Sequence, residues 1–369
     1  MTRNNISPRS RSPLALALAL ALVLTACGDD QPQPAPIEAA STESPASIEP
    51  APAPTPSGPT TALPPNELGE IMVLEYHRLG ENEGEWIRSA EHFKEDLANL
   101  YERGYRPITM RQLLSGDINT PAGTTPVVFT FDDSSLGQFY FLDDGSIDPN
   151  TMVGMWAAFQ EQNPAWSNGG VWCILPGAEH PSNFFGKHPS KEVPREEREA
   201  NIRRKVDYLT ANGHEICNHT MWHARLDKYD DAFVQDQIGS GEDSIQAYLP
   251  PDYDIVTFAL PLGMWPETES LAWQGTYREG KEYSYDAVLE VAGGPNESPF
   301  DIAFDPHSVN RFVMAPGALD RQLAAYEQRP GDRFISDGLP DVVSVPANRV
   351  NDLNQQRVGD REVRTVESP

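Results

Sequence analysis

From residue 71 onward, short apolar segments alternate with longer segments in which apolar residues recur every three or four positions. The apolar segments are predicted strands. They cover residues 71–76, 126–131, 171–175 and 255–260, with weaker examples at 287–291 and 311–315, and residues 215–218 are predicted as a further short strand. The segments between them predict helices that begin near Ser89, Thr151, Pro194 and Asp231. Repeated strand–helix units imply an α/β fold in which a parallel sheet is covered by helices.

Polar side chains follow these strands at their carboxyl ends. His77 ends the first strand, Asp132 and Asp133 end the second, and His219 ends the fourth. Active groups collect at this end of the sheet in barrels of parallel strands. We therefore expect these four residues on one rim, although an Asp pair after a strand is also a common turn.

The spacing of His219 and His223 predicts a metal site. On a helical turn, residues four apart share a face, so both imidazoles could hold one ion, and Thr220 could bond the backbone of that turn. Two imidazoles and one carboxylate suit zinc or a similar ion. Three protein ligands leave a position for water, which is typical of catalytic rather than structural zinc.

Two motifs carry a family resemblance. Thr130-Phe131-Asp132-Asp133 and His219-Thr220-Met221-Trp222-His223 together resemble the polysaccharide deacetylases, the NodB-homology carbohydrate esterases of family 4. The resemblance runs from about residue 71 to residue 346 and implies a distorted (β/α) barrel. It implies that Asp132 is the catalytic base, that Asp133, His219 and His223 are the metal ligands, and that the cofactor is a divalent metal, Zn²⁺ first.

The order of the motifs is similar to that of a permuted branch of the family, which includes poly-N-acetylglucosamine deacetylases. In that branch a Tyr-His strand precedes the TFDD strand, and Glu75-Tyr76-His77 occupies this place. The resemblance implies that His77 is the general acid. His307 is the alternative, and His77 is preferred because it ends an apolar strand.

The third family motif, Arg-x-Pro-Tyr, is altered here to Leu260-Pro261-Leu262-Gly263 after Ala259. The Arg that orients the base is missing, and the backbone N–H groups of Leu262 and Gly263 remain as candidate oxyanion donors. Arg311 resembles an Arg found late in permuted members and would replace the missing partner of Asp132. The alternative for Arg311 is a surface position in an acidic protein.

Trp222 and Trp265 lie next to the motifs in sequence. Both are candidate substrate-binding residues that would stack on sugar rings, and both could equally be core residues.

The resemblance implies metal-dependent N-deacetylation of an N-acetylated polysaccharide. The candidate residues suit this reaction, because amide hydrolysis needs an activated water, a stabilised oxyanion and a protonated leaving amine. One alternative is an esterase that uses the same site on O-acetyl groups. Another is a lipoprotein that binds glycan or metal without turnover, which the altered third motif suggests.

Cys173 and Cys217 have three readings in the sequence. They form a disulfide, as an exported protein permits, or they are buried free thiols. In the third reading, Cys217 joins a closed Cys/His zinc site.

Residues 1–26 have the pattern of a signal peptide: a basic start and an apolar run from Leu14 to Leu24, shorter than the roughly 20 residues that span a bilayer. Leu24-Thr25-Ala26-Cys27 resembles the lipobox of bacterial lipoproteins, which implies an exported protein with a lipid on Cys27. Such an anchor would hold the protein on a membrane, facing the periplasm or the cell exterior.

Residues 27–66, which begin with Cys27 and are rich in Pro and Ala, predict a disordered tether. The deacetylase domain is expected at residues 67–350 and a polar C-terminal tail at 351–369. A net charge of −27 argues against nucleic acid as a partner.

Overall fold

The computed structural model describes residues 58–166, 169–178, 183–186 and 193–367. The predicted signal peptide, Cys27 and most of the predicted tether lie outside these ranges. None of the helices within them combines the length and the apolar character that a bilayer-spanning segment requires.

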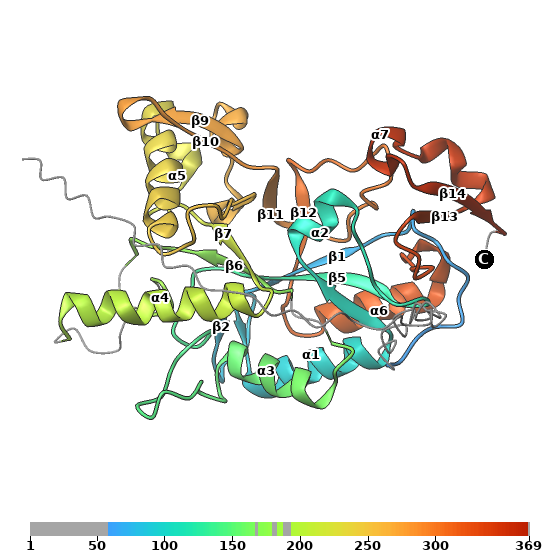
Figure 1. Cartoon of the computed structure of the whole chain (residues 1–369), viewed down its shortest axis with the longest axis horizontal. Helices are drawn as coiled ribbons and strands as arrows, with labels where there is room; N and C mark the ends of the chain where they lie inside the picture. The colour runs from blue at the N-terminus through green and yellow to red at the C-terminus, as the bar shows by residue number, and fades with distance from the viewer. Residues whose placement is uncertain (1–57, 167–168, 179–182, 187–192, 368–369) are drawn as a thin grey trace, which may run out of the picture. The chain divides into compact units, whose positions relative to one another are not determined.

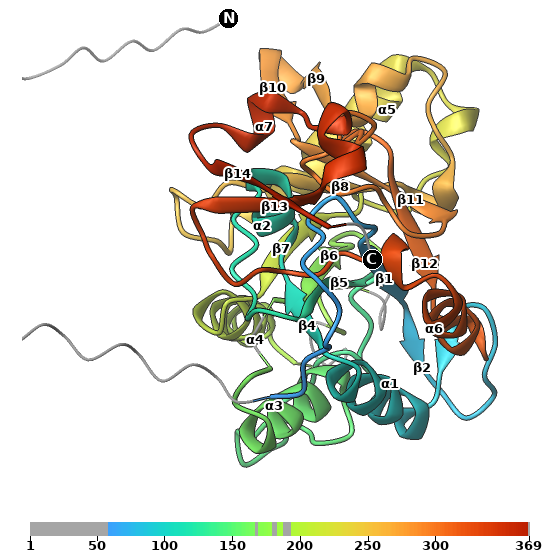
Figure 2. The same cartoon turned by 90° about the vertical axis from the view of Figure 1, so that its right-hand side faces the viewer.

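Seven parallel strands close into a barrel (Figures 1 and 2). Each strand pairs with the next in the order β1, β12, β11, β8, β7, β6, β5, and β5 pairs back with β1. The strands are β1 (Met72–Tyr76), β5 (Thr125–Phe131), β6 (Val171–Ile174), β7 (Glu215–Asn218), β8 (Thr257–Ala259), β11 (Ala287–Gly293) and β12 (Val309–Val313). The predicted (β/α) barrel is confirmed, and each of its seven strands falls within a few residues of a predicted one.

An eighth strand, β4 (Tyr105–Ile108), is absent from the prediction. It pairs parallel with the first half of β5, and β6 takes its place beside Thr130 and Phe131. Because Arg106 and Pro107 interrupt its sequence, β4 is not a continuous apolar run. Arg106 is nevertheless buried, because its guanidinium donates to the backbone carbonyls of Tyr105 and Pro59.

Helices cover the outside of the barrel. They are α1 (Ala90–Glu102), α3 (Met152–Gln162), α4 (Arg195–Ala211), α5 (Asp231–Gln246) and α6 (Ala318–Gln328). The hydroxyls of Ser89 and Thr151 accept backbone N–H bonds at the starts of α1 and α3, which lie side by side in both views (Figures 1 and 2). Outward-facing strand residues such as Leu74 and Phe129 pack in one cluster with residues of these helices.

The other face of each strand lines the barrel interior, because side chains alternate along a strand. This interior cluster includes Val73, Val128, Ala259 and Leu289, together with Cys173 and Cys217. The two cysteines occupy paired positions on β6 and β7 and form a disulfide, which selects one of the three readings of the sequence.

The amino ends of the strands are covered by α2 (Met110–Ser115) and a C-terminal layer. The layer contains the parallel pair β13 (Val342–Pro346) and β14 (Glu362–Val366), with α7 (Gln355–Val358). Side chains of α2, β13 and α7 join the interior cluster. Residues 351–367, expected as a polar tail, thus contain α7 and β14.

Two small sheets complete the described structure. β2 (Arg78–Leu79) and β3 (Ile87–Arg88) pair just after β1. The hairpin of β9 (Gln274–Tyr277) and β10 (Lys281–Ser284) packs on α5, as Figure 1 shows.

Candidate active site

The turn after β5 presents Asp132 and Asp133. The backbone N–H of Asp132 donates to the carbonyl of Tyr76 at 2.9 Å. The buried amide of Gln138 donates to the carbonyls of Asp132 at 2.6 Å and His77 at 2.5 Å. These bonds tie the end of β5 to the end of β1, so the predicted base and the predicted acid are held on one rim.

His219 and His223 meet across an irregular turn. The predicted helical turn is wrong, because Thr220 and His223 have φ values of 65° and 58°, in the left-handed region. Thr220 does bond the backbone: its hydroxyl accepts the N–H of His223 at 3.0 Å. This bond, rather than helical spacing, brings the two rings to 4.9 Å between centroids.

Asp133, His219 and His223 form a group with the composition of a metal site. Asp133 Oδ1 lies 3.7 Å from His219 Nε2 and 3.6 Å from His223 Nε2. His219 Nδ1 lies 2.9 Å from the carbonyl of Ala259, which can only accept, so Nδ1 carries the proton and Nε2 has a free lone pair. Nε2 is buried without a hydrogen-bond partner among the described residues. An orphaned imidazole nitrogen beside a carboxylate fits a divalent ion.

Arg311 holds Asp132 from across the barrel. Its Nη1 and Nη2 donate to the two oxygens of Asp132 at 2.8 Å each. Both side chains are buried, so the surface reading of Arg311 is excluded. Burial alone would raise the pKa of Asp132, but Arg311 outweighs it and holds that pKa well below its usual range. Asp132 is therefore ionised and able to accept a proton.

His77 lies on the same rim, half-buried against Trp86 with ring centroids 4.7 Å apart. Burial lowers the pKa of His77 to about 4, although Asp132 acts in the other direction. His307 is elsewhere: it stacks on Trp273 and adjoins α2, at the amino ends of the strands. Of the two candidate acids, the structure places His77 beside Asp132.

A cavity of about 170 Å³ opens over these groups. Its walls are His77, Arg78, Trp86, Asp132, Asp133, His219, His223, Leu262 and Val291. Leu262, a predicted oxyanion donor, lines this cavity and has a φ of 59°. Gly263 does not line the cavity, and its N–H donates to the carbonyl of Leu260.

The two predicted aromatic platforms lie outside the cavity wall. Trp222 is 57% exposed and packs on Gly177, while the half-buried Trp265 donates its indole N–H to Glu290. The aromatic wall of the cavity is Trp86, which belongs to the short β2–β3 connection and to neither sequence motif. Its position nine residues after His77 is the only signal for it in the sequence.

Backbone strain gathers at this rim. Of the eight non-glycine residues with positive φ in the described ranges, five lie in the site loops: Asp133, Ser134, Thr220, His223 and Leu262. Such conformations cost on the order of 1–3 kcal/mol each and persist where surrounding contacts enforce them. Ser134 shows how: its hydroxyl accepts the N–H of Leu175 at 3.1 Å.

Fold and site together define a parallel α/β barrel that carries, at its carboxyl rim, an ionised carboxylate and an Asp/His/His group with the composition of a metal site. Residues 187–275 match the family model described as polysaccharide deacetylase. The match spans α4 to β9 and includes His219 and His223, while Asp132, Asp133 and His77 reach the site from outside it. Over residues 187–275 the chain is similar to the polysaccharide deacetylases, the family that its two motifs resemble.

Several solved structures are similar to the chain at low identity. The Streptococcus pyogenes deacetylase PplD, in complex with acetate, is 14% identical, with a TM-score of 0.45 over 68% of this chain and 97% of that one. IcaB from Ammonifex degensii is 16% identical, with a TM-score of 0.46 over 70% and 97%. The polysaccharide deacetylase BC0361 from Bacillus cereus is 15% identical, with a TM-score of 0.47 over 69% and 68%. No curated protein sequence matches the chain.

Proposed function

We propose that this protein is a metal-dependent deacetylase that removes N-acetyl groups from a polysaccharide outside the cytoplasm. The observation that carries the proposal is the pairing of an ionised, Arg-held carboxylate with a separate Asp/His/His group in one cavity. Two functions, base and ligand, need two carboxylates, and Asp132 and Asp133 supply them.

The ligand group supports zinc. Asp133, His219 and His223 offer one oxygen and two nitrogens within 4.8 Å of one another, a set that zinc accepts while keeping a position open. Bound there, the ion would supply a water of lowered pKa and a Lewis acid for the acetyl carbonyl.

The chain's own residues supply the proton transfers. Asp132 accepts a proton from the attacking water, and Arg311 keeps its oxygens oriented and ionised. His77, on the same rim, donates a proton to the departing nitrogen. The N–H of Gly263 is engaged in the turn, so Leu262 is the remaining backbone candidate for stabilising the oxyanion.

Metal content measured alongside acetate release tests the proposal. Wild type should bind close to one zinc ion and release acetate from chitooligosaccharides, and Asp133→Ala should lose both. Asp243→Ala, which removes an exposed carboxylate paired with Lys281, should lose neither. Metal binding without acetate release would favour the glycan- or metal-binding lipoprotein. Faster release from acetylated xylan than from chitooligosaccharides would favour the O-acetyl esterase.

The extracytoplasmic location is part of the same proposal and is supported by the sequence of residues 1–27. Lipid on Cys27 would anchor the domain through the Pro-rich segment. Wild type should fractionate with membranes and take up labelled palmitate, and Cys27→Ser should do neither. A membrane-bound, unlabelled wild type would contradict the lipoprotein assignment.

A further inference from the structure

A glycine in the middle of α5, Gly241, lies against the ligand turn, which is the segment of residues 219–223. Glycine weakens a helix interior, so a glycine at this position needs a structural reason. A Cβ added to Gly241 would lie 2.7 Å from Asn218 Oδ1 and 2.9 Å from the carbonyl carbon of Thr220. Such distances are too short for any larger side chain, so Gly241 is what lets α5 approach the backbone of the ligand turn.

Asn218 joins the ligand turn to α5. It ends β7, and its side chain is 0% exposed. Its amide group donates to the carbonyl of Ile238 at 2.9 Å, and its Oδ1 accepts the N–H of Thr220 at 3.0 Å. The N–H of Met221 donates to the carbonyl of Gln237 at 2.9 Å. The ligand turn is therefore bonded to two consecutive carbonyls of α5.

The orientation of the Asn218 amide is fixed by its partners. The amide group also donates to the hydroxyl of Tyr285 at 2.7 Å, and that hydroxyl donates to Glu242 of α5 at 2.5 Å. The nitrogen of Asn218 thus faces two acceptors, and its oxygen faces the N–H of Thr220. A flipped amide would lose all three bonds, so the side chain has one orientation.

The ligand turn needs these contacts because its backbone is strained. Thr220 and His223 have positive φ values, which persist only where surrounding contacts enforce them. We infer that Asn218 and α5 set the geometry of the metal-ligand group, with Asn218 as the positioning residue that holds the ligand turn and Gly241 as the position that gives it room. This inference rests on the proposed function, in which His219 and His223 bind the ion.

The effect passes through the backbone of the ligand turn rather than through contact with the ion or the substrate. Asn218, Gly241 and Tyr285 are not among the described residues that line the cavity. All three are also uncharged at neutral pH, since burial raises the pKa of Tyr285 well above its usual value. A substitution at any of them leaves the ligands themselves intact and changes only where the two imidazoles lie.

Zinc affinity measures this positioning directly. In Asn218→Ala, the Kd for Zn²⁺, measured by competition with a chelator, should rise by about 10- to 100-fold, as is typical when a group that orients a ligand is removed. The visible absorption spectrum of the Co²⁺-loaded protein should change as well, because it depends on ligand geometry. Tyr285→Phe keeps the ring and removes one acceptor of the amide, so its Kd should rise by about tenfold or less.

The matched control is Asn296→Ala. Asn296 is 5% exposed, and its side chain makes two hydrogen bonds of 2.8 Å with the backbone of Asn310, near the start of β12. The apoprotein should lose stability to urea in both alanine variants, because each loses a buried amide. Only Asn218→Ala should lose zinc affinity.

Gly241→Ala provides a second, independent test. The added methyl group would push the ligand turn away from α5, so the Kd for Zn²⁺ should rise by about tenfold or more. Gly239→Ala is the control on the same helix, because its Cβ would lie 2.3 Å from the ring of Tyr277 and far from the ligand turn. This variant should change the Kd by less than about threefold.

The outcomes separate the positioning role from the proposed function. Unchanged Kd values and Co²⁺ spectra in Asn218→Ala and Gly241→Ala would overturn the positioning role. Equal losses of zinc affinity in the two control variants would also overturn it, because they would reveal a general effect of destabilisation. Weaker zinc binding in these variants of a protein that releases no acetate would support the positioning role and refute the deacetylase function.

Discussion

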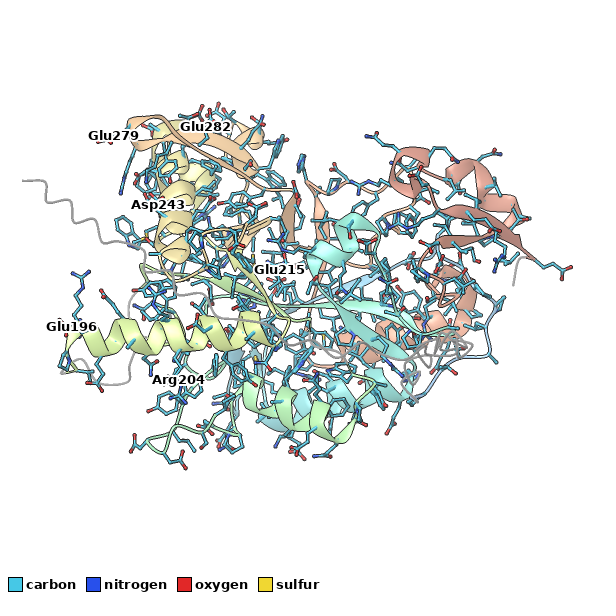
Figure 3. The ribbon with its side chains drawn as sticks, viewed as in Figure 1. Glu196, Arg204, Glu215, Asp243, Glu279 and Glu282 are labelled. Atoms are coloured by element: carbon cyan, nitrogen blue, oxygen red, sulfur yellow. A yellow bond between two sulfur atoms is a disulfide. The ribbon has the colours of Figure 1, made fainter. Side chains whose placement is uncertain are left out.

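The two ends of the barrel differ in whether a buried glutamate accepts hydrogen bonds from the protein. Glu215, labelled in Figure 3, begins β7 at the amino end, and its oxygens accept the hydroxyl of Thr257 at 2.9 Å and the N–H of Arg111 at 3.0 Å. Glu75, at the carboxyl end, accepts no hydrogen bond among the described residues. His77 Nδ1 and His219 Nε2, on the same rim, are also without one.

This contrast shows how one barrel divides stability from reactivity. At the amino end, both oxygens of the buried carboxylate of Glu215 already accept hydrogen bonds from the protein. At the carboxyl end, the orphaned atoms carry an energetic penalty that a bound ion, water or substrate can relieve. Substitutions at the two ends should therefore affect different properties.

The largest effect is expected from Asp132→Asn. The amide has nearly the same shape but cannot take a proton from water, so acetate release should fall by about 10²- to 10⁴-fold. Metal content should stay at the wild-type value, because Asp133 and the two histidines remain. Loss of the metal in this variant would show that Asp132 is a ligand, and the division of roles between the two aspartates would be wrong.

Arg311→Met should affect stability as well as activity. Asp132 and Glu75 would lose the cation between them, and the free energy of unfolding should fall by about 3–5 kcal/mol at neutral pH. The deficit should shrink in acid, as the carboxylates take up protons. Arg111→Met, at the amino end, removes an Arg that packs over Tyr253 and should change stability by less than about 1 kcal/mol. Similar urea midpoints for the two variants would contradict the expected difference between the two ends of the barrel.

The last effect is on stability alone and concerns Glu67, whose oxygens accept the N–H groups of Ser344 and Asp337 beside β13. Burial raises the pKa of Glu67 from 4.5 to about 8, although the bond from Ser344 opposes this. The folded protein then holds a proton that the unfolded chain has lost. Its contribution to stability is complete below pH 4.5 and disappears as the pH rises to about 8.

Urea unfolding across this range should show the decline in wild type, with a slope of at most about 1.4 kcal/mol per pH unit from this group. Glu67→Gln cannot titrate and should remove that part of the slope. Parallel pH profiles for the two proteins would mean that Glu67 has an ordinary pKa in the folded state.

The sequence predicts most of the strands well because burial on both faces makes them nearly continuous apolar runs, as in residues 126–131 and 171–175. It does not predict β4, where Arg106 is buried through bonds to carbonyls that only the folded chain brings near. It also gives the wrong backbone for His219 to His223, because nothing in the spacing signals positive φ at Thr220.

The site is predictable where a motif contains it and unpredictable where the fold assembles it. Asp132 and Arg311 are 179 residues apart, so their bidentate pairing depends on β5 and β12 both flanking β1. Glu75 did leave a signal in the sequence: it is the one charged residue of the apolar strand Met72–Tyr76. A charge in such a strand is rarely buried without a partner or a purpose.

The position of the disulfide inside the barrel determines when it can form during folding. Cys173 and Cys217 are 0% exposed, and the walls around them are closed strands. No thiol or oxidase can reach the sulfurs once the barrel has formed, because exchange requires attack on an accessible sulfur. The bond must therefore form while β6 and β7 can still separate from the other strands, and afterwards it responds to unfolding rather than to the redox potential of the surroundings.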